Sequence, residues 1–497
     1  MQNSIWKIIV LSLSFIFAIL FYKHLVGLNF LLFNTVIIGL TIFKFKVKNK
    51  RVLLLVMINL LMACMVVLNG SFVAKFMAWI SLFIAIGSIL FPSIKSLLRT
   101  IFSWCGNTII SIPLFFRKNQ EGKGGIRIFK TIKIILIPIL IIVVFILFYK
   151  SANPVFNKYI NSIFEHFSTF FKKFNLQFIL WYLLGFILSI LLILTHSSKW
   201  KVVSDRENSK TDTLIRKRIR HYFSSFIGLK MEYKSALFLF ASLNLILFFF
   251  NITDVYHLWF NFNWDGGFLK AFVHEGTYLL IVSLLLSIVV TLLYFRRNLN
   301  FLQNNKLLKI LAVFWLSQNL FMLISVGLRN YHYIEHFALA HKRIGVYFFL
   351  AICAAGLISC IIKVWRVKSF HYLERVNAFS VYLILIGMAC VNWDIVIAKY
   401  NFSNYNKSFL HLPYMLGLSE KALPYIDYTD EQLEKMDDVQ NKKFGYEERG
   451  YHKKVDYKKR LENKKSKFIE EYEKRHWISW NYADFKAYEK LKNKSYD

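Results

Sequence analysis

The chain has 497 residues, of which 56% are hydrophobic and 18% are aromatic, and its formal net charge at pH 7 is +34. This composition excludes an ordinary soluble globular protein. The charge does not indicate nucleic-acid binding, because residues 400–497 carry a net charge of only +3 while residues 1–399 carry +31, mostly in loops beside apolar segments. Basic residues at such positions set membrane orientation and contact lipid headgroups. We therefore expect the lipid bilayer, and no nucleic acid, as a partner.

Eleven apolar segments are long enough to cross a hydrocarbon core of ~30 Å. Such segments must be helical, because lipid offers no hydrogen-bond partner to backbone N–H and C=O groups. The sequence predicts an all-α, polytopic integral membrane protein with about 11 transmembrane helices, at residues 5–22, 25–43, 52–69, 72–91, 132–149, 177–196, 235–252, 276–295, 309–328, 345–365 and 380–398.

Lys and Arg are distributed unequally between the loops on the two sides of these spans. With the N-terminus inside, the inner loops, among them 197–234 and 363–375, carry 30 basic residues and the outer loops carry nine. This asymmetry follows the positive-inside rule. It predicts a multi-pass protein of the bacterial inner (cytoplasmic) membrane whose C-terminal tail is periplasmic. The first apolar run lacks a small-residue cleavage site, so we interpret it as an uncleaved span.

The predicted organisation has three parts. Residues 1–230 form an N-terminal membrane region of about six spans, residues 231–399 form a C-terminal membrane region of about five, and residues 400–497 form a charged helical tail. In the first part we expect an interfacial helix pair at Ser93–Phe116 on the inner face and an amphipathic helix at Pro154–Phe174 on the outer leaflet.

The tail shows start signals for helices. Thr429-x-x-Gln432 resembles a capping box, a charged helix follows at Asp456–Arg475, and Asn481-x-x-Asp484 opens a last helix. Trp477, Trp480 and Tyr482 would form an aromatic knot between these two helices. The apolar surface is too small for a robust independent core. We therefore expect the tail to dock onto the outer face of the bundle or onto an envelope protein partner.

Polar residues at the outer ends of the spans form a candidate binding site. Acids, imidazoles and guanidinium groups near the ends of four spans would meet at one depth, where they could bind an anionic headgroup, an ion or a peptide. The central pair would be Glu275 and Arg329. The full set is His274, Glu275, Arg329, Glu335, Arg343 and Asp394. The alternative is a set of structural contacts, with Arg329 paired to Glu275 or Glu335. Deeper in the spans, Asn34, Asn59, Gln318 and Asn319 are expected to form interhelical hydrogen bonds.

A metal site has weaker support. His332-x-x-Glu335-His336 matches an inverted zinc-protease pattern, and imidazoles at i and i+4 share a helix face. The pattern is short and lies in a His- and Glu-rich interfacial segment, so we expect no metal and no cofactor, with His332 and His336 as the only candidates. The five cysteines show neither zinc spacing nor a disulfide framework.

Several motifs carry a family resemblance. They are Val273-His274-Glu275-Gly276-Thr277-Tyr278, Trp315-x-x-Gln318-Asn319, Arg343-Ile344-Gly345-Val346, Asn392-x-Asp394, Tyr400-Asn401 and Tyr414-x-x-Gly417-Leu418-Ser419. Together they resemble a family of bacterial polytopic membrane proteins, frequent in Bacteroidota, that is catalogued only as a domain of unknown function. The resemblance covers residues 230–425 well and the N-terminal spans in outline. Such proteins typically show Gly-Leu-Thr where this chain has Ala338-Leu339-Ala340, and His332 and His336 are not part of the pattern. The resemblance implies an integral membrane protein and no reaction.

The leading functional hypothesis is a non-enzymatic, envelope- or transport-associated membrane protein with a polar site at the outer-leaflet boundary. The alternative is a membrane enzyme that modifies a lipid or peptide at the periplasmic face, with His274 or Glu275 as general base. A transporter would need a cavity that reaches Gln318 and Asn319, whereas an enzyme would need His274 or Glu275 beside a second titratable group. The sequence does not decide between them.

Overall fold

The computed structural model of the chain is helical. It describes residues 2–115, 162, 176–193, 211–216, 229–260, 266–295, 298–444 and 454–494, and the one β-bridge within them is isolated and joins Thr213 to Lys368. The helices of the bundle are α1 (Gln2–Phe21), α2 (Leu28–Phe45), α3 (Lys50–Asn69), α4 (Phe72–Leu90), α5 (Leu97–Phe115), α8 (Leu176–Ile193), α10 (Leu229–Asp254), the π-helix η1 (Val255–Phe260), α11 (Gly266–Tyr294), the 3-10 helix η2 (Asn298–Phe301), α12 (Lys306–Phe337), α13 (His341–Trp365) and α14 (Phe370–Ala389).

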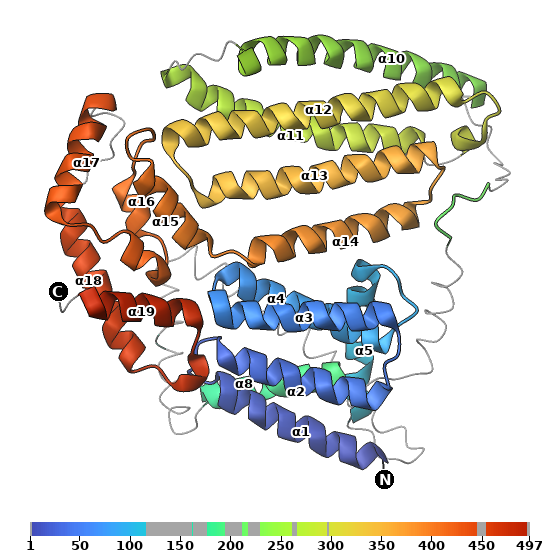
Figure 1. The fold of residues 1–497 in the computed structure, drawn as a ribbon. Coiled ribbons are helices and arrows are strands. Elements are labelled where there is room, and N and C mark those ends of the chain that lie inside the picture. The colour runs from blue at the N-terminus through green and yellow to red at the C-terminus, as the bar shows by residue number, and fades with distance from the viewer. Residues whose placement is uncertain are drawn as a thin grey trace.

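Shorter helices follow α14 to the C-terminus. They are α15 (Trp393–Ser403), α16 (Leu412–Leu416), η3 (Glu420–Tyr425), α17 (Asp430–Lys443), α18 (Lys454–Glu473), η5 (Trp477–Ser479) and α19 (Tyr482–Lys494). Figure 1 shows most of the long helices side by side, with α15 to α19 gathered at one end of the bundle and the N-terminus at the opposite end. α15 begins before residue 400 and packs with the tail, so it crosses the expected boundary of the tail.

Seven helices are long and apolar enough to cross a membrane within the described ranges. These are α2, α3, α4, α10 with η1, α12, α13 and α14, and shorter apolar helices lie at Ile5–Phe21, Gln177–Ile190 and Leu279–Tyr294. Ten of the eleven expected spans overlap one of these ten helices. The eleventh, 132–149, and the expected amphipathic helix Pro154–Phe174 lie outside the described residues, apart from Ser162. The chain is therefore an all-helical, multi-pass membrane protein.

The position expected for the last span is wrong. The sequence predicted it at 380–398, whereas α14 begins ten residues earlier at Phe370 and ends at Ala389. The ionised side chains near the start of α14 caused the error. A hydropathy scale treats each of them as unfavourable in a membrane span, although two of them form ion pairs in the structure. Arg99 donates from Nε to Oε1 of Glu374 at 2.7 Å, and Arg375 donates to Asp212 at 2.5 Å.

The stretch Ser93–Phe116 forms one helix and not a pair. α5 runs without a break through Gly106 and Pro113 to Phe115. In Figure 1, α5 runs across the ends of α3 and α4 and not along them. Arg51 of α3 donates to the carbonyl of Ile94 at 3.0 Å just before α5 begins.

Two hydrophobic clusters fill the bundle. The first joins α1 to α5 and α8, the second joins α10 to α14, and Tyr382 and Ala389 of α14 belong to the first. Asn34 and Asn59 form interhelical hydrogen bonds as expected, since Asn34 Nδ2 donates to Asn59 Oδ1 at 3.0 Å and Asn59 Nδ2 donates to Ser81 Oγ at 3.2 Å. These bonds join α2, α3 and α4 without placing a free amide in lipid.

The tail helices match the predicted start signals. Thr429 and Gln432 form the capping box of α17, and Asn481 accepts from the backbone N–H of Asp484 at 2.9 Å as α19 begins. The tail also has a hydrophobic cluster, which Ile344 of α13 joins. The expected aromatic knot is absent from the described residues, because the side chains of Trp477 and Tyr482 remain 64% and 43% exposed.

The tail docks onto the bundle, as expected, through a close contact with the start of α2. The N–H of Leu28 donates to the carbonyl of Trp480 at 3.0 Å. Gly27 lies against the same backbone, and a Cβ there would come within 2.6 Å of the carbonyl oxygens of Ser479 and Trp480. Only glycine allows this approach.

Substituting Gly27 by Ala should therefore loosen the docked tail. We expect G27A to increase the rate of proteolytic cleavage between η5 and α19 several-fold while the bundle stays intact. The matched control is G39A in α2, where an added Cβ meets nothing within 4 Å. Equal cleavage rates for G27A, G39A and the unchanged chain would contradict this account of docking.

Candidate functional site

The structure places the polar span ends expected outside at one end of the bundle. The end of α10, the start of α11, the junction between α12 and α13, and the end of α14 all lie at the end that carries the tail (Figure 1). His274 and Glu275 fall near the start of α11, and their side chains lie outside the described part of the chain. The four remaining members of the expected site go to three places.

Arg329 forms a buried ion pair with Asp254. Their side chains are 4% and 5% exposed, and the pair joins α12 to the last residue of α10. The expected partner Glu335 is exposed and lies 3.7 Å from Nδ1 of His332. α12 continues for two turns beyond Arg329, so the guanidinium lies inside the bundle and not at the end of its helix. Removing two charges from water is costly, and this geometry is stable only while both charges are present.

Arg343 and Asp394 lie together where α13 meets the tail. Arg343 donates to the carbonyl oxygen of Phe337 at 2.6 Å and to that of Ala338, which satisfies the C-terminus of α12, and its guanidinium lies 4.6 Å from the ring centroid of Tyr333. Cations at a helix C-terminus are favoured by the helix dipole. The role of Arg343 in the described structure is therefore to close the turn between α12 and α13.

Asp394 connects α13 to η3. Its Oδ1 lies 2.9 Å from Nε2 of His341, and its Oδ2 accepts from Ser419 at 2.6 Å. Burial raises the pKa of this carboxyl, but the hydrogen bonds from His341 and Ser419 outweigh burial and hold the pKa below its usual value. The other ring nitrogen of His341 lies 2.8 Å from the hydroxyl of Tyr414. Asp394, His341 and Tyr414 thus form a carboxylate–imidazole–hydroxyl chain that joins α13, α15 and α16.

The same junction contains Ala338-Leu339-Ala340, where the chain departs from the Gly-Leu-Thr pattern. Ala338 has φ +65° and ψ −174°, a backbone region that glycine adopts freely and other residues enter at a cost. Asn401 accepts from the N–H of Leu339 at 2.7 Å and donates to its carbonyl at 2.9 Å. Ala340 is the N-cap of α13, and its methyl group cannot accept a hydrogen bond from the free N–H groups of the first turn. A threonine at this position would supply a hydroxyl oxygen as acceptor.

His332 and His336 do not form part of a metal cluster in the described structure. No group of three His, Cys, Asp or Glu side chains that could hold a metal is present among the described residues. The ring of His336 packs edge-on against Phe444, with centroids 5.2 Å apart, so this imidazole belongs to the contact between α12 and the tail.

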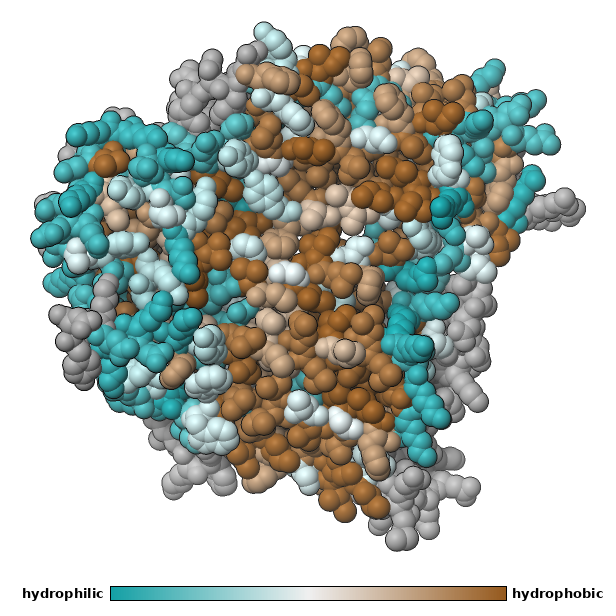
Figure 2. Space-filling view, viewed as in Figure 1, coloured by the Kyte–Doolittle hydropathy of each residue, from teal (hydrophilic) through white to brown (hydrophobic). Residues whose placement is uncertain are grey.

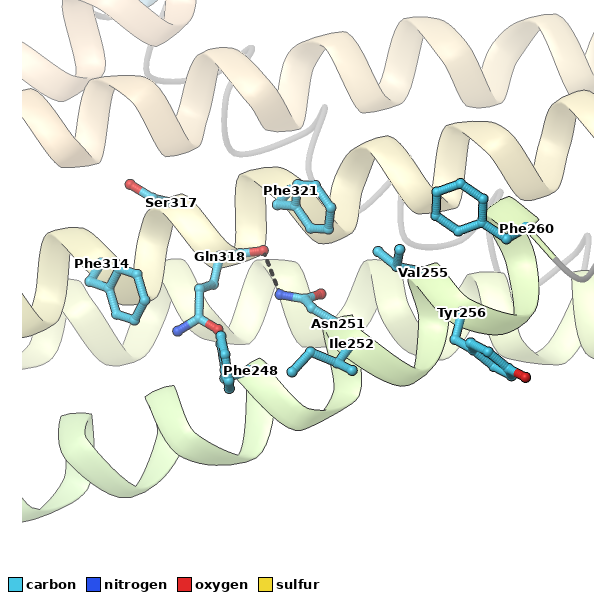
Figure 3. Close-up of a pocket in the computed structure, with 10 residues that line it drawn as sticks. All are labelled: Phe248, Asn251, Ile252, Val255, Tyr256, Phe260, Phe314, Ser317, Gln318 and Phe321. Atoms are coloured by element: carbon cyan, nitrogen blue, oxygen red, sulfur yellow. Dashed lines mark hydrogen bonds between the residues drawn. The ribbon is translucent and has the colours of Figure 1, made fainter.

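A groove of about 610 Å³ lies beside α10, η1 and α12 (Figure 3). Its walls are mostly aromatic and aliphatic, and several of its side chains are exposed on the face of the bundle, Phe260 to 76%. The lining residues are Phe248, Asn251, Ile252, Val255, Tyr256, Phe260, Phe314, Ser317, Gln318 and Phe321. This volume is within the range of small-molecule sites, ~300–1,000 Å³.

Two amide side chains supply the polar character of the groove. Asn251 Nδ2 donates to the carbonyl of Gln318 at 3.4 Å, and Gln318 Nε2 donates to Asn244 Oδ1 at 2.8 Å. Both amide nitrogens thus have acceptors, whereas Asn251 Oδ1 and Gln318 Oε1 are buried and accept no hydrogen bond within the described residues. Unsatisfied buried acceptors are costly, and both oxygens lie behind the surface of the groove, so a ligand that donates to them must first shift the two side chains.

Sequence reasoning missed Asp254 as the partner of Arg329 and missed the groove. Asp254 is the one carboxylate at the end of its apolar run, at the same expected depth as Arg329, and opposite charges at equal depth were a usable signal. The π-helix η1, which often marks functional sites, begins at the next residue. No periodicity in the sequence identified η1, because its wider turn depends on contacts with α12 such as Trp259 Nε1 to Ser325 Oγ at 3.0 Å.

The buried pair predicts a non-additive effect on stability. R329M should destabilise the chain by about 3–5 kcal/mol, because it leaves Asp254 charged and buried, whereas D254L combined with R329M should cost far less. Thermal unfolding of the detergent-purified protein measures both. Additive losses in the double variant would contradict a mutually dependent pair.

The strained turn predicts a stabilising substitution. A338G should raise the free energy of unfolding by about 1 kcal/mol, since glycine removes the Cβ from an unfavourable backbone region. The control A351G, at an exposed helical position of α13, should lower it by about 1 kcal/mol. A loss of stability in A338G as large as that in A351G would refute the assignment of strain to Ala338.

A model of one protein family matches residues 8–428, described as a domain of unknown function (DUF4153). No curated protein and no solved structure matches the chain. The matched range contains the buried ion pair, the groove and the junction around Ala338, and it ends before α17, so α17 to α19 lie beyond it. The chain therefore belongs to the DUF4153 family, a family of unknown function.

Proposed function

We propose that the chain is a non-enzymatic membrane protein that binds a lipid-like ligand in the groove between α10, η1 and α12. The observation that carries this proposal is the combination of apolar walls with two buried amide oxygens that lack donors. An acyl or isoprenoid chain would contact the aromatic walls, and a hydroxyl or amide group on the ligand would donate to Asn251 or Gln318. The transport-associated hypothesis needed a cavity reaching Gln318 and Asn319, and Gln318 lines the groove whereas Asn319 does not.

The proposal includes the arrangement in the membrane. About 11 spans, an N-terminus on the cytoplasmic side of a bacterial inner membrane and a periplasmic tail are supported by the excess of basic residues in the expected inner loops. They are further supported by the positions of the N-terminus and the tail at opposite ends of the bundle (Figure 1).

Among the described residues of the expected polar site, Arg329 is the one that contributes to the groove. Its partner Asp254 is adjacent in the chain to Val255, which lines the groove. We infer that the ion pair holds the start of η1 against α12 and thereby keeps the wall of the groove in place. His274, Glu275, Glu335, Arg343 and Asp394 remain candidates for polar contacts at the same outer boundary. The described contact that bears on the alternative of an enzyme is the chain from Asp394 through His341 to Tyr414.

Filling the groove should displace its ligand. We expect full-length protein purified in mild detergent to carry a bound apolar molecule that mass spectrometry detects after extraction, and I252W should abolish this signal. I246W is the matched control, because Ile246 is exposed on α10 and does not line the groove. Recovery of the same molecules at the same ratio from I252W and I246W would overturn the proposal.

A further inference from the structure

A second, smaller pocket lies where the tail meets the bundle, far along the chain from the groove residues. It is formed by the end of α3, the start of α15, η3 and α19, and its volume is about 170 Å³. This is too small for a whole drug-sized ligand but suits a compact polar group. The charged and aromatic lining residues are Lys421, Tyr425, Tyr482, Lys486 and Lys490.

The lysines of this pocket outnumber the carboxylates that pair with them. Lys421 pairs with Asp484 at 3.2 Å, and the same carboxylate accepts from Arg475 at 2.5 Å. Lys486 and Lys490 form no ion pair within the described residues. One carboxylate thus serves two cations, while two further lysines of the pocket have none.

The unpaired lysines are held in place by tyrosines. Lys490 Nζ donates to the hydroxyl of Tyr425 at 3.3 Å and lies 4.6 Å from its ring centroid, and Lys399 Nζ lies 4.6 Å from the same centroid. Lys486 Nζ lies 5.7 Å from the ring centroid of Tyr482. Lys486 and Lys490 both line the pocket and like charges repel, so an anion bound beside these two ammonium groups would offset their charge.

The pocket lies at the border between apolar and hydrophilic surface. Leu68 lines it from the end of α3, and Phe72 at the start of α4 is exposed on the neighbouring bundle surface. Figure 2 shows the hydrophobic surface of the bundle ending where the hydrophilic surface of the tail begins. The exposed aromatic residues Trp477 and Tyr482 of the tail are of the kind that anchors proteins at lipid headgroup level.

We propose that this pocket binds the phosphate of an anionic phospholipid and so fastens the tail to the bilayer surface. Lys486 and Lys490 donate to the phosphate oxygens, Lys421 adds positive charge from below, and the acyl chains lie along the exposed apolar surface beside Leu68 and Phe72. A free phosphate ion shares the headgroup chemistry but not the chains, and the apolar surface next to the pocket favours the lipid. This inference does not depend on the groove ligand.

The test uses the full-length protein in detergent and native mass spectrometry to measure the binding of added dioleoyl phosphatidylglycerol. K486Q combined with K490Q should weaken binding by roughly 30-fold, because each of the two lysines near an anionic lipid strengthens binding about fivefold. The matched control is K435Q combined with K442Q, which removes the same charge from exposed positions of α17. This control should bind phosphatidylglycerol as the unchanged protein does.

Three results would overturn the inference. One is equal phosphatidylglycerol binding by the pocket variant and the α17 variant. A second is equal loss of dioleoyl phosphatidylcholine binding in the pocket variant, because that lipid has no net charge. The third is displacement of phosphatidylglycerol by millimolar inorganic phosphate without chains, which would assign the pocket to free phosphate. All substituted lysines are exposed, so we expect both variants to fold, and unchanged thermal unfolding in the absence of lipid checks this.

Discussion

Within an apolar bundle, each polar group needs a partner, because lipid supplies none, and this constraint accounts for much of the architecture. Backbone groups meet it by forming helices. Side chains meet it in pairs between helices, as Asn34 does with Asn59 and as Arg329 does with Asp254. Each such pair joins two segments at one register, so the same bonds that satisfy polar groups also set how the helices align.

The exceptions to this constraint are informative. In the groove beside α10, η1 and α12, the amide nitrogens of Asn251 and Gln318 have partners and their oxygens do not. Within the described residues Asn34 Oδ1 is unsatisfied in the same way, so what distinguishes Asn251 and Gln318 is that both line the groove. The π-helix η1 forms part of the wall there, next to the buried ion pair, so an irregular backbone and unsatisfied acceptors occur in the same place.

The motifs that carry the family resemblance largely explain architecture and not chemistry. Arg343, Asn401 and Asp394 each tie the turn between α12 and α13 to its neighbours, and Asn392 caps α15. The tail then builds on this junction and contributes lysines to a pocket at its edge. The family match ends at residue 428, so Tyr425 lies within it, whereas Lys486 and Lys490 belong to the tail beyond it.

Sequence alone determined the properties that depend on local composition. The helical class, the seven apolar helices long enough to cross a membrane within the described residues, the capping box at Thr429 and the cap at Asn481 all follow from neighbours within a few residues. Tertiary structure decided the start of α14, the partner of Arg329, the single helix α5 and both pockets. The reason is physical. A hydropathy scale assigns each ionised residue the full free energy of desolvation, whereas in the folded protein that free energy is partly offset by a partner from a distant part of the chain. Arg99 and Glu374 are 275 residues apart and Arg329 and Asp254 are 75 apart, so only folding brings them together.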